Sequence, residues 1–265
     1  MIASQVLKKL ARQWNLNVDA VEKHYILGWI LYGISKSSIG KCLVFKGGTA
    51  LSKIYFPSDW RLSEDLDFTV LDDTKWNAIV QALDQEVPPI VQRKGEITIS
   101  LRKNPHTNPG YLQVKIKYNG PISPGTVKIE ISKEQFIGTV VRKTIPNNPE
   151  DFDYPKFSAK VYSPETIVGE KTRAILQRGY IRDYYDVWRL FKENKFDQKE
   201  ALNMFNKKCV AKDVKFSNVE EFFPDGIADI LKEHLPNLMR LVREKPPPIK
   251  TILDELRKSL NKFFA

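Results

Sequence analysis

The sequence predicts an α/β protein of the α+β type, in which a mixed sheet flanked by helices comes first and a helical bundle follows. Segments that alternate apolar and polar residues gather in the first 160 residues, whereas apolar residues recur at helical spacing after that point. We therefore expect two domains. The first spans residues 1–160 and includes N-terminal helices within 4–35, and the second spans residues 161–265.

The chain is predicted to begin with two helices and a short strand. Apolar residues recur at helical spacing over residues 4–14, and Asn17 is a suitable N-cap for a second helix over 18–35. A strand at 43–45 then leads through a pair of glycines into a helix at 50–55. This order places a tight turn directly between a strand and a helix.

The middle of the chain is predicted to supply most of the sheet. The sequence Asp72-Asp73-Thr74 indicates a helix start, and residues 76–92 have helical periodicity. Three stretches then alternate with period two and predict consecutive, mostly antiparallel strands: 96–102, 111–118 and 126–132. Residues 142–160 are rich in proline and charge, which predicts an irregular connection with room for one short strand.

The second domain is predicted to be all helical. Ser163-Pro164-Glu165 indicates a helix start, because serine is favoured at the N-cap and proline at the first helical position. Helices are expected at 164–177, 181–194, 198–208, 225–243 and 249–263. The three prolines at 246–248 separate the last helix from the one before it.

Composition is that of an ordinary globular protein, with 42% hydrophobic and 28% charged residues in a chain of 265. No apolar run reaches the roughly 18 residues that a membrane helix needs, and the amphipathic start carries no cleavable signal pattern. We therefore expect a cytoplasmic protein without a membrane segment. Cys42 and Cys209 lie far apart and outside any C-x-x-C motif, so neither a disulfide framework nor cysteine-ligated zinc is expected.

The net charge of +10 is unevenly distributed. Residues 91–160 carry 12 Lys and Arg against 6 Asp and Glu, whereas residues 1–90 carry 10 of each. A basic surface of this kind attracts polyanions, so RNA or DNA is the natural candidate partner. An ordinary solvated basic surface explains the same count equally well.

Residues 45–68, FKGGTALSKIYFPSDWRLSEDLDF, combine a glycine turn with a pair of acids. Gly47, Gly48 and Thr49 stand at the predicted strand-to-helix turn, where backbone N–H groups are unpaired and glycine lets a phosphate approach them. The Thr49 hydroxyl adds a donor. Lys53, one helical turn later, is placed to reach a phosphate, although a solvated helix lysine fits the pattern as well.

The acids predict a divalent metal site. Asp65 and Asp67 alternate with apolar residues as on a strand, so their side chains share one side and lie about 6.5–7 Å apart. Glu130 on a later strand would complete an oxygen-rich site of the kind that Mg²⁺ prefers, with Mn²⁺ as the alternative ion. A lone D-x-D pair is commonly a pair of exposed strand acids, and Glu130 alone also fits a solvated strand face. The glycine turn just before the pair favours a site.

Together these residues resemble the AbiEii/AbiGii-type nucleotidyltransferase toxins of the polymerase-β-like nucleotidyltransferase superfamily. The glycine pair, the D-x-D acids and a third acid on a later strand form the superfamily pattern. The toxin family adds an arginine and a Ser or Thr before the acids, matched by Arg61 and Ser63, a lysine in the second half, matched by Lys171, and an R/K-D-x-x-D helix, matched by Arg182, Asp183 and Asp186. The resemblance covers roughly residues 40–190 and leaves residues 195–265 without an assigned role.

The resemblance implies roles for the added residues. Arg61, with a planar fork suited to phosphate oxygens, and Ser63 would bind the nucleotide; a salt bridge of Arg61 with a nearby acid is the alternative. Lys171 falls beside an apolar helix face, where a triphosphate or acids of the site would neutralise it. The family needs the lysine and the R/K-D-x-x-D helix for activity, so the resemblance implies catalytic roles for Lys171, Asp183 and Asp186. The position of Asp183 near its helix start also fits an N-cap that pairs with Arg173 or Arg182, and for Asp186 a structural role fits as well as a catalytic one.

The implied activity is metal-dependent transfer of a nucleoside monophosphate from an NTP to an acceptor hydroxyl, by a nucleotidyltransferase fold over residues 1–160. The family further implies a toxin of a toxin–antitoxin or phage-defence pair, an RNA or tRNA acceptor, and a separate antitoxin protein. Phosphotransfer, NMP transfer onto a protein, and a non-catalytic nucleotide- or RNA-binding module remain alternatives.

Overall fold

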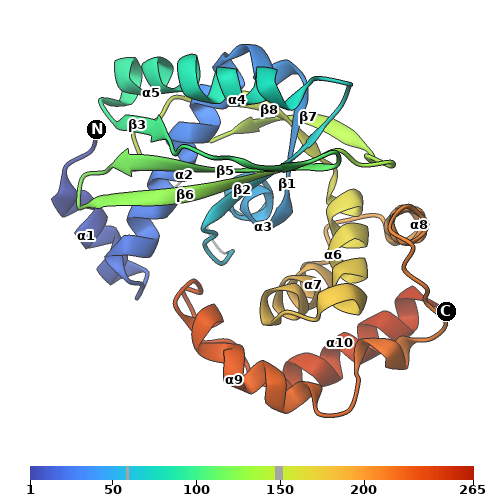
Figure 1. The fold of residues 1–265 in the computed structure, drawn as a ribbon. Helices are drawn as coiled ribbons and strands as arrows, with labels where there is room; N and C mark the ends of the chain where they lie inside the picture. Colours follow the sequence, from blue (N-terminus) through green and yellow to red (C-terminus); the bar gives the residue numbers. More distant parts are fainter. Residues whose placement is uncertain (58–59, 147–151) are drawn as a thin grey trace. The chain divides into compact units, whose positions relative to one another are not determined.

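The computed structural model describes residues 1–57, 60–146 and 152–265. The chain forms two compact units, unit 1 from Met1 to Val161 and unit 2 from Tyr162 to Ala265. The predicted division at 160/161 falls one residue before this boundary. The described elements are coloured along the sequence in Figure 1.

Unit 1 carries all the strands that the structure describes. Its helices and helical turns are α1 (Ser4–Gln13), α2 (Val18–Lys36), η1 (Ser38–Lys41), α3 (Gly47–Ala50), the π-helical turn η2 (Leu51–Tyr55), α4 (Trp76–Gln85) and α5 (Val87–Gly95). Its strands are β1 (Leu43–Lys46), β2 (Asp65–Val70), β3 (Thr98–Leu101), β4 (His106–Asn108), β5 (Tyr111–Asn119), β6 (Pro124–Ser132), β7 (Val140–Ile145) and β8 (Phe157–Tyr162), whose last residue already belongs to unit 2.

The strands form one mixed sheet in the order β3-β5-β6-β2-β1-β8-β7, with β4 paired to β5. The pairs β3–β5 and β5–β6 are antiparallel, as expected for consecutive strands, and β1–β2 is antiparallel as well, whereas β2–β6 and β1–β8 are parallel. A mixed sheet with flanking helices confirms the predicted fold class. The topology also brings β2 and β6, which are far apart in sequence, into direct contact at the centre.

One face of the central strands is apolar and the other is polar. Leu66 and Phe68 on β2 and Ile129 and Ile131 on β6 are buried, while the acids that alternate with them are only half-buried. Helices α4 and α5 lie along one side of the sheet in Figure 1. The alternation therefore fixes the strand register, because a slip by one residue would bury the acids.

Unit 2 is helical, as predicted. Its elements after β8 are α6 (Pro164–Arg178), α7 (Ile181–Glu193), α8 (Gln198–Ala211), η3 (Val219–Phe222), α9 (Ile227–Met239) and α10 (Ile249–Phe263). Helix α6 packs against α7 and α8, and α7 packs against α9 and α10. The Ser163 side chain accepts a hydrogen bond from the Thr166 backbone N–H, so the predicted N-cap is in place.

Two predicted elements differ from the structure. The single helix expected at 76–92 is two helices, α4 and α5, because Pro88 and Pro89 stand at the start of the second one and cannot continue the first. The connection expected at 142–160 contains two strands, β7 and β8, rather than one; its residues 147–151 lie outside the described part. The strand β4 was not predicted.

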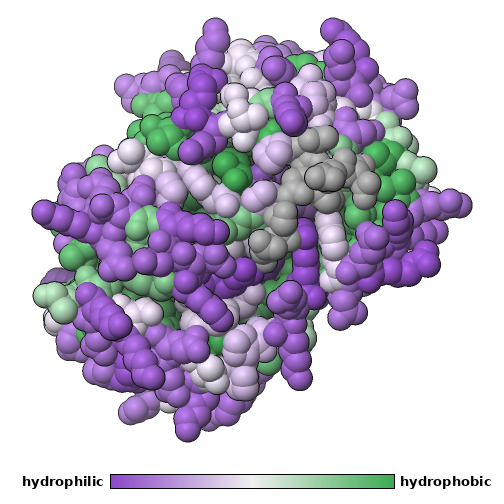
Figure 2. All heavy atoms as spheres, turned by 180° about the vertical axis from the view of Figure 1, so that it is seen from behind, coloured by the Kyte–Doolittle hydropathy of each residue, from purple (hydrophilic) through white to green (hydrophobic). Residues whose placement is uncertain are grey.

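The face of the molecule seen from behind (Figure 2) is mainly polar. Figure 2 shows one face, where hydrophilic residues predominate and hydrophobic ones occur in small separate patches. Within the described residues, no helix is long and apolar enough to cross a membrane.

Candidate active site

The turn after β1 places its glycines against the acids of β2. Gly47 has a φ of +76°, a conformation that glycine adopts without strain, and it starts α3 directly after the extended Lys46. A Cβ atom on Gly47 would come within 2.2 Å of Asp67 Oδ2. The phosphate turn and the D-x-D strand, inferred separately from the sequence, are therefore in van der Waals contact.

Thr49 and Lys53 point into the interior rather than towards a ligand. The buried Thr49 hydroxyl donates to the Asp65 carbonyl oxygen and so ties the turn to β2. Lys53 is 2% exposed, donates to the His24 carbonyl oxygen at 2.7 Å, and lies over the rings of Phe152 and Tyr154. The predicted phosphate contact of Lys53 is thus wrong, because its ammonium is held inside the core.

Arg61 and Ser63 lie beside the second glycine. A Cβ atom on Gly48 would meet an Arg61 guanidinium nitrogen at 2.8 Å and the Ser63 hydroxyl at 3.3 Å. Arg61 is 3% exposed and donates to the Leu62 carbonyl oxygen. The Ser63 hydroxyl is buried and has no hydrogen-bond partner among the described residues. An orphaned hydroxyl of this kind is available to a ligand oxygen.

The three acids are brought together by strand register. Asp67 on β2 pairs with Glu130 on the parallel strand β6, and Asp65 is two residues from Asp67 on the same side. In the part of the chain that the structure describes, no three or more His, Cys, Asp or Glu side chains are gathered as a metal-binding group. Strand pairing thus places the three acids next to one another along the backbone, although their side chains are not gathered around one point.

A lysine lies among these acids. Lys128 pairs in register with Asp65, and its Nζ is 2.8 Å from Glu130 Oε1 and 3.9 Å from Asp65 Oδ2. Burial lowers the pKa of Lys128, but the hydrogen bond and charge of Glu130, with the charges of Asp65 and Asp67, outweigh burial and leave the pKa raised. The acids thus already attract one cation.

Tyr111 on β5 adds an aromatic hydroxyl to the same surface. Burial raises the pKa of the Tyr111 phenol, and a hydrogen bond with Glu130 and the charges of Asp67 and Asp65 raise it further. Its hydroxyl also lies 3.4 Å from Gln113 Oε1. Neither Lys128 nor Tyr111 was predicted. The Lys-x-Glu alternation around Glu130 did contain a signal for Lys128, since residues two apart on a strand share a side.

The predicted residues of unit 2 form a buried ion-pair cluster. Lys171 Nζ is 2.9 Å from Asp186 Oδ2 and 3.4 Å from Asp183 Oδ1. Asp183 also accepts two hydrogen bonds from Arg178, an arginine that was not among its expected partners Arg173 and Arg182. The N-cap of α7 is Tyr180 and not Asp183.

Electrostatics favour the charged form of Asp183 in this cluster. Burial alone would raise the pKa of Asp183, but the charges of Lys171 and Arg178 and the Arg178 hydrogen bonds hold it below the usual value. Asp186 is fully buried, with 0% exposure. The acids on α7 therefore supply the partner that Lys171 needs beside an apolar face. The part of these three residues in a reaction stays a prediction.

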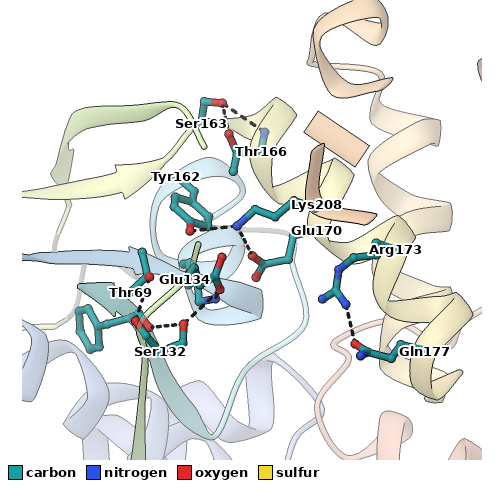
Figure 3. A network of polar contacts seen from close by, with 12 residues as sticks. Thr69, Ser132, Glu134, Tyr162, Ser163, Thr166, Glu170, Arg173, Gln177 and Lys208 are labelled. Atoms are coloured by element: carbon teal, nitrogen blue, oxygen red, sulfur yellow. Dashed lines mark hydrogen bonds and ion pairs between the residues drawn. The ribbon is translucent and has the colours of Figure 1, made fainter. Parts of the chain in front are cut away.

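A further buried cation of unit 2, Lys208, was not predicted. Lys208 on α8 is 1% exposed, and its Nζ lies 3.1 Å from both Glu170 Oε2 and the Tyr162 hydroxyl (Figure 3). Figure 3 also shows Glu134 of unit 1 beside Ser132; Glu134 forms an ion pair with Lys46. The local sequence around Lys208 and Lys46 gives no sign that either lysine pairs with a distant acid.

Backbone amides at a glycine turn bind phosphate, and carboxylates on adjoining strands bind the divalent cation that accompanies it. In this chain the glycine turn meets the acidic strand through Gly47 and Asp67, an arrangement suited to an enzyme that acts on a nucleotide.

The family described as "Nucleotidyl transferase AbiEii toxin, Type IV TA system" matches residues 29–259, and the chain belongs to this family. It is therefore a nucleotidyltransferase and the toxin of a type IV toxin–antitoxin system, which implies an antitoxin partner.

Solved structures share the fold. MenT4, a nucleotidyltransferase toxin from Mycobacterium tuberculosis H37Rv, matches with a TM-score of 0.69 and 17% identity, over 100% of this chain and 90% of that one. The crystal structure of JHP933 from Helicobacter pylori matches with a TM-score of 0.54 and 20% identity, over 94% of this chain and 93% of that one. No curated protein matches in sequence.

Proposed function

We propose that the protein transfers a nucleoside monophosphate from an NTP to a hydroxyl group of an RNA acceptor, with a tRNA-like molecule as the first candidate, and that the transfer depends on Mg²⁺. The observation that supports this most is the contact between the phosphate turn at Gly47 and the acid Asp67, with Glu130 in register beside it. A nucleotide bound at the turn would hold its phosphates directly next to three carboxylates.

The donor set fits a divalent cation. Asp65, Asp67 and Glu130 offer oxygen ligands only, which is the chemistry that Mg²⁺ prefers, and Mn²⁺ accepts the same set. The Lys128 ammonium beside two of these acids supports the fit, because it is a tethered cation in the same place. The three acids would hold the ion, which would supply Lewis-acid stabilisation of the negative charge on the phosphates.

The chain's own residues would perform the remaining tasks. Backbone N–H groups at Gly47 and Gly48 would bind phosphate oxygens, and the orphaned Ser63 hydroxyl and the Arg61 guanidinium beside Gly48 would orient them. The acceptor oxygen forms a bond to the α-phosphorus while the bond to the pyrophosphate oxygen breaks. The Glu130 carboxylate would accept the proton of the attacking hydroxyl.

Incubation with NTPs labelled at the α or the γ phosphate tests the proposal, with bulk tRNA as acceptor. Label from the α position should enter the RNA, and label from the γ position should leave as pyrophosphate. Entry of the γ label alone would show phosphotransfer instead. Labelling of a protein and not of RNA would reassign the acceptor. Removal of Mg²⁺ with a chelator should abolish transfer, and Mg²⁺ or Mn²⁺ should restore it.

A variant of Asp65 tests whether the protein catalyses the transfer or only binds a nucleotide or RNA. Asp65→Asn should lower the transfer rate to about one-hundredth or less, because it removes charge stabilisation at the reacting phosphate. Asp73→Asn, at an exposed acid of the same unit, should leave the rate unchanged. Equal rates for wild type and Asp65→Asn would reject the catalytic role and favour a non-catalytic nucleotide- or RNA-binding module.

A further inference from the structure

A basic groove of about 640 Å³ opens over β3, β4 and β5 of unit 1. Its lining includes four exposed cationic side chains, those of Arg102, Lys103, Lys115 and Lys117. None of the residues described as lining it is acidic. A concave surface lined by one sign of charge concentrates the potential, so this groove would attract a polyanion.

The groove opens on the face of the sheet that carries the catalytic acids. Gln113 lines the groove and pairs in register with Glu130, which pairs in turn with Asp67. Directly paired residues project to the same side of a sheet, and neighbouring strands lie about 4.8 Å apart. The edge of the groove is therefore one strand away from Glu130 and two from Asp67.

A second row of paired residues leads from the acids into the groove. Asp65 pairs with Lys128, Lys128 pairs with Lys115, and the Arg102 backbone N–H donates to the Lys115 carbonyl oxygen. At about 4.8 Å per strand, Lys115 lies about 10 Å and Arg102 about 14 Å from the strand of Asp65. From Asp65 towards the β3 edge of the sheet, one cationic residue of this row thus lies at each successive strand.

The acids separate this groove from the phosphate turn. The strand order places Gly47 at the end of β1, on one side of β2, and places β6, β5 and β3 on the other side. A nucleotide held at the turn would use the β1 side. The groove on the β5 side is therefore placed for the second substrate, with the acids between the two.

We propose that this groove binds the phosphodiester backbone of a single-stranded segment of the acceptor RNA and so brings the acceptor hydroxyl to the acids. The inference rests on the proposed function and specifies where and in which form the acceptor binds. His106 lines the groove opposite Gln113, and its ring makes an edge-to-face contact with that of Tyr111, with ring centroids 6.3 Å apart. Aromatic rings in such a position stack unpaired bases, whereas a duplex keeps its bases covered.

Binding to a single-stranded RNA of about 12 nucleotides, labelled with a fluorophore and titrated at several salt concentrations, tests the groove directly. Lys115→Gln with Lys117→Gln should weaken binding about tenfold or more. It should also reduce the slope of log K against log salt by about 1.4, since each lost phosphate contact on a single strand removes about 0.7. The affinity for the NTP, measured by calorimetry without RNA, should not change.

A matched control carries the same change of charge away from the groove. Lys8→Gln with Lys9→Gln alters two exposed lysines on α1, which do not line the groove, and should retain the wild-type salt slope. Equal slopes for wild type and the Lys115/Lys117 variant would overturn the proposal. So would a loss of NTP affinity in that variant, because the groove would then belong to the donor, and so would tighter binding of a blunt duplex than of the single strand.

The binding test stands apart from the test of the reaction. If Asp65→Asn abolishes transfer while the Lys115/Lys117 variant binds RNA like wild type, the groove inference fails and the proposed function stands. If no NTP-dependent labelling of RNA occurs with the wild-type protein, the proposed function fails, whatever the groove binds. In transfer assays the Lys115/Lys117 variant should show a raised KM for RNA and an almost unchanged kcat, because its acids are intact.

Discussion

Gly47 lies where the turn after β1 meets the first acidic strand, and two independent constraints act on it. Its φ of +76° disfavours any residue with a Cβ atom, and the space that a Cβ would occupy is taken by Asp67 Oδ2, 2.2 Å away. The close approach would let a phosphate at the turn share its surroundings with a carboxylate that we propose binds the metal. A change at Gly47 would therefore affect both the turn proposed to bind phosphate and the position of Asp67.

Gly47→Ala should abolish transfer, because the new methyl group must displace Asp67 in addition to straining the backbone. Gly226→Ala is the matched control: Gly226 has a φ of +77°, and nothing lies within 4 Å of its Cβ position. The control should lose only about 1–2 kcal/mol of unfolding free energy and keep its activity. Equal activities in the two variants, measured by α-label transfer, would contradict the displacement of Asp67.

At the scale of single residues, the sequence predicted the strand positions of the acids better than the direction in which the Lys53 side chain points. Asp65, Asp67 and Glu130 lie on adjoining strands as the D-x-D alternation implied. Lys53 did not behave as predicted, because the π-helical turn after α3 and the aromatic residues near 152–154 hold its ammonium inside. No local pattern reveals a partner a hundred residues away, so the error could not be avoided from helix spacing alone.

Among elements, the packing of α6 on α8 depends on a buried charge. Lys208 from α8 is 1% exposed, while the side chain of its partner Glu170 from α6 keeps 19% exposure. Glu170 directly precedes Lys171, so the pair also fixes the segment of α6 that holds the predicted site lysine. When one partner of an ion pair is removed, the loss of stability is larger if the charge left behind is buried than if water reaches it.

This asymmetry predicts that Glu170→Gln destabilises the protein more than Lys208→Met. The first variant deprives a buried ammonium of its carboxylate and should cost about 3 kcal/mol, whereas the second leaves a carboxylate that water can reach and should cost about 1 kcal/mol. Urea denaturation measures both. Lys199→Met, at an exposed lysine of α8, should stay within about 0.5 kcal/mol of wild type. A larger loss for Lys208→Met than for Glu170→Gln would refute the argument.

Elements were predictable where local signals were complete. The N-cap at Ser163, the helix that follows it and the alternating strands β5 and β6 all lie close to their expected ranges. The helix expected at 76–92 failed because its periodicity continues across Pro88 and Pro89. The strands β7 and β8 were underestimated because their partners are distant: β8 pairs with β1, more than a hundred residues earlier.

At the scale of the whole molecule, exposed basic residues and buried ion pairs lie in different parts of the chain. The basic groove over β3, β4 and β5 lies in the basic segment 91–160, while the buried ion pairs of Lys171 and Lys208 lie in unit 2. The charge count indicated where exposed basic residues gather, because exposed charge is additive along a sequence; binding of a polyanion there stays a prediction. The count did not indicate the buried ion pairs, because it carries no information on burial: residues 161–186, which include Lys171, hold equal numbers of acids and bases, and Lys208 lies beyond them.

The Asp183 cluster gives the molecule a defined response to acid. The pKa of Asp183 is lower in the folded protein than its ordinary value of 3.8, so its stabilisation is complete above that value and disappears as the pH falls through the folded pKa. Asp183→Asn should therefore be less stable than wild type by about 3 kcal/mol near neutral pH, and the difference should shrink below about pH 4.

Urea denaturation over the range from pH 7 to pH 2.5 would measure this difference, because both proteins gain the same charge from all other carboxylates. Asp229→Asn serves as the control: its carboxylate pairs with Lys232 in solvent, so the variant should follow the wild-type curve closely. A difference between wild type and Asp183→Asn that stays constant down to the lowest pH would show that Asp183 is not held ionised by Lys171 and Arg178. The cluster would then stabilise α6 against α7 by packing alone.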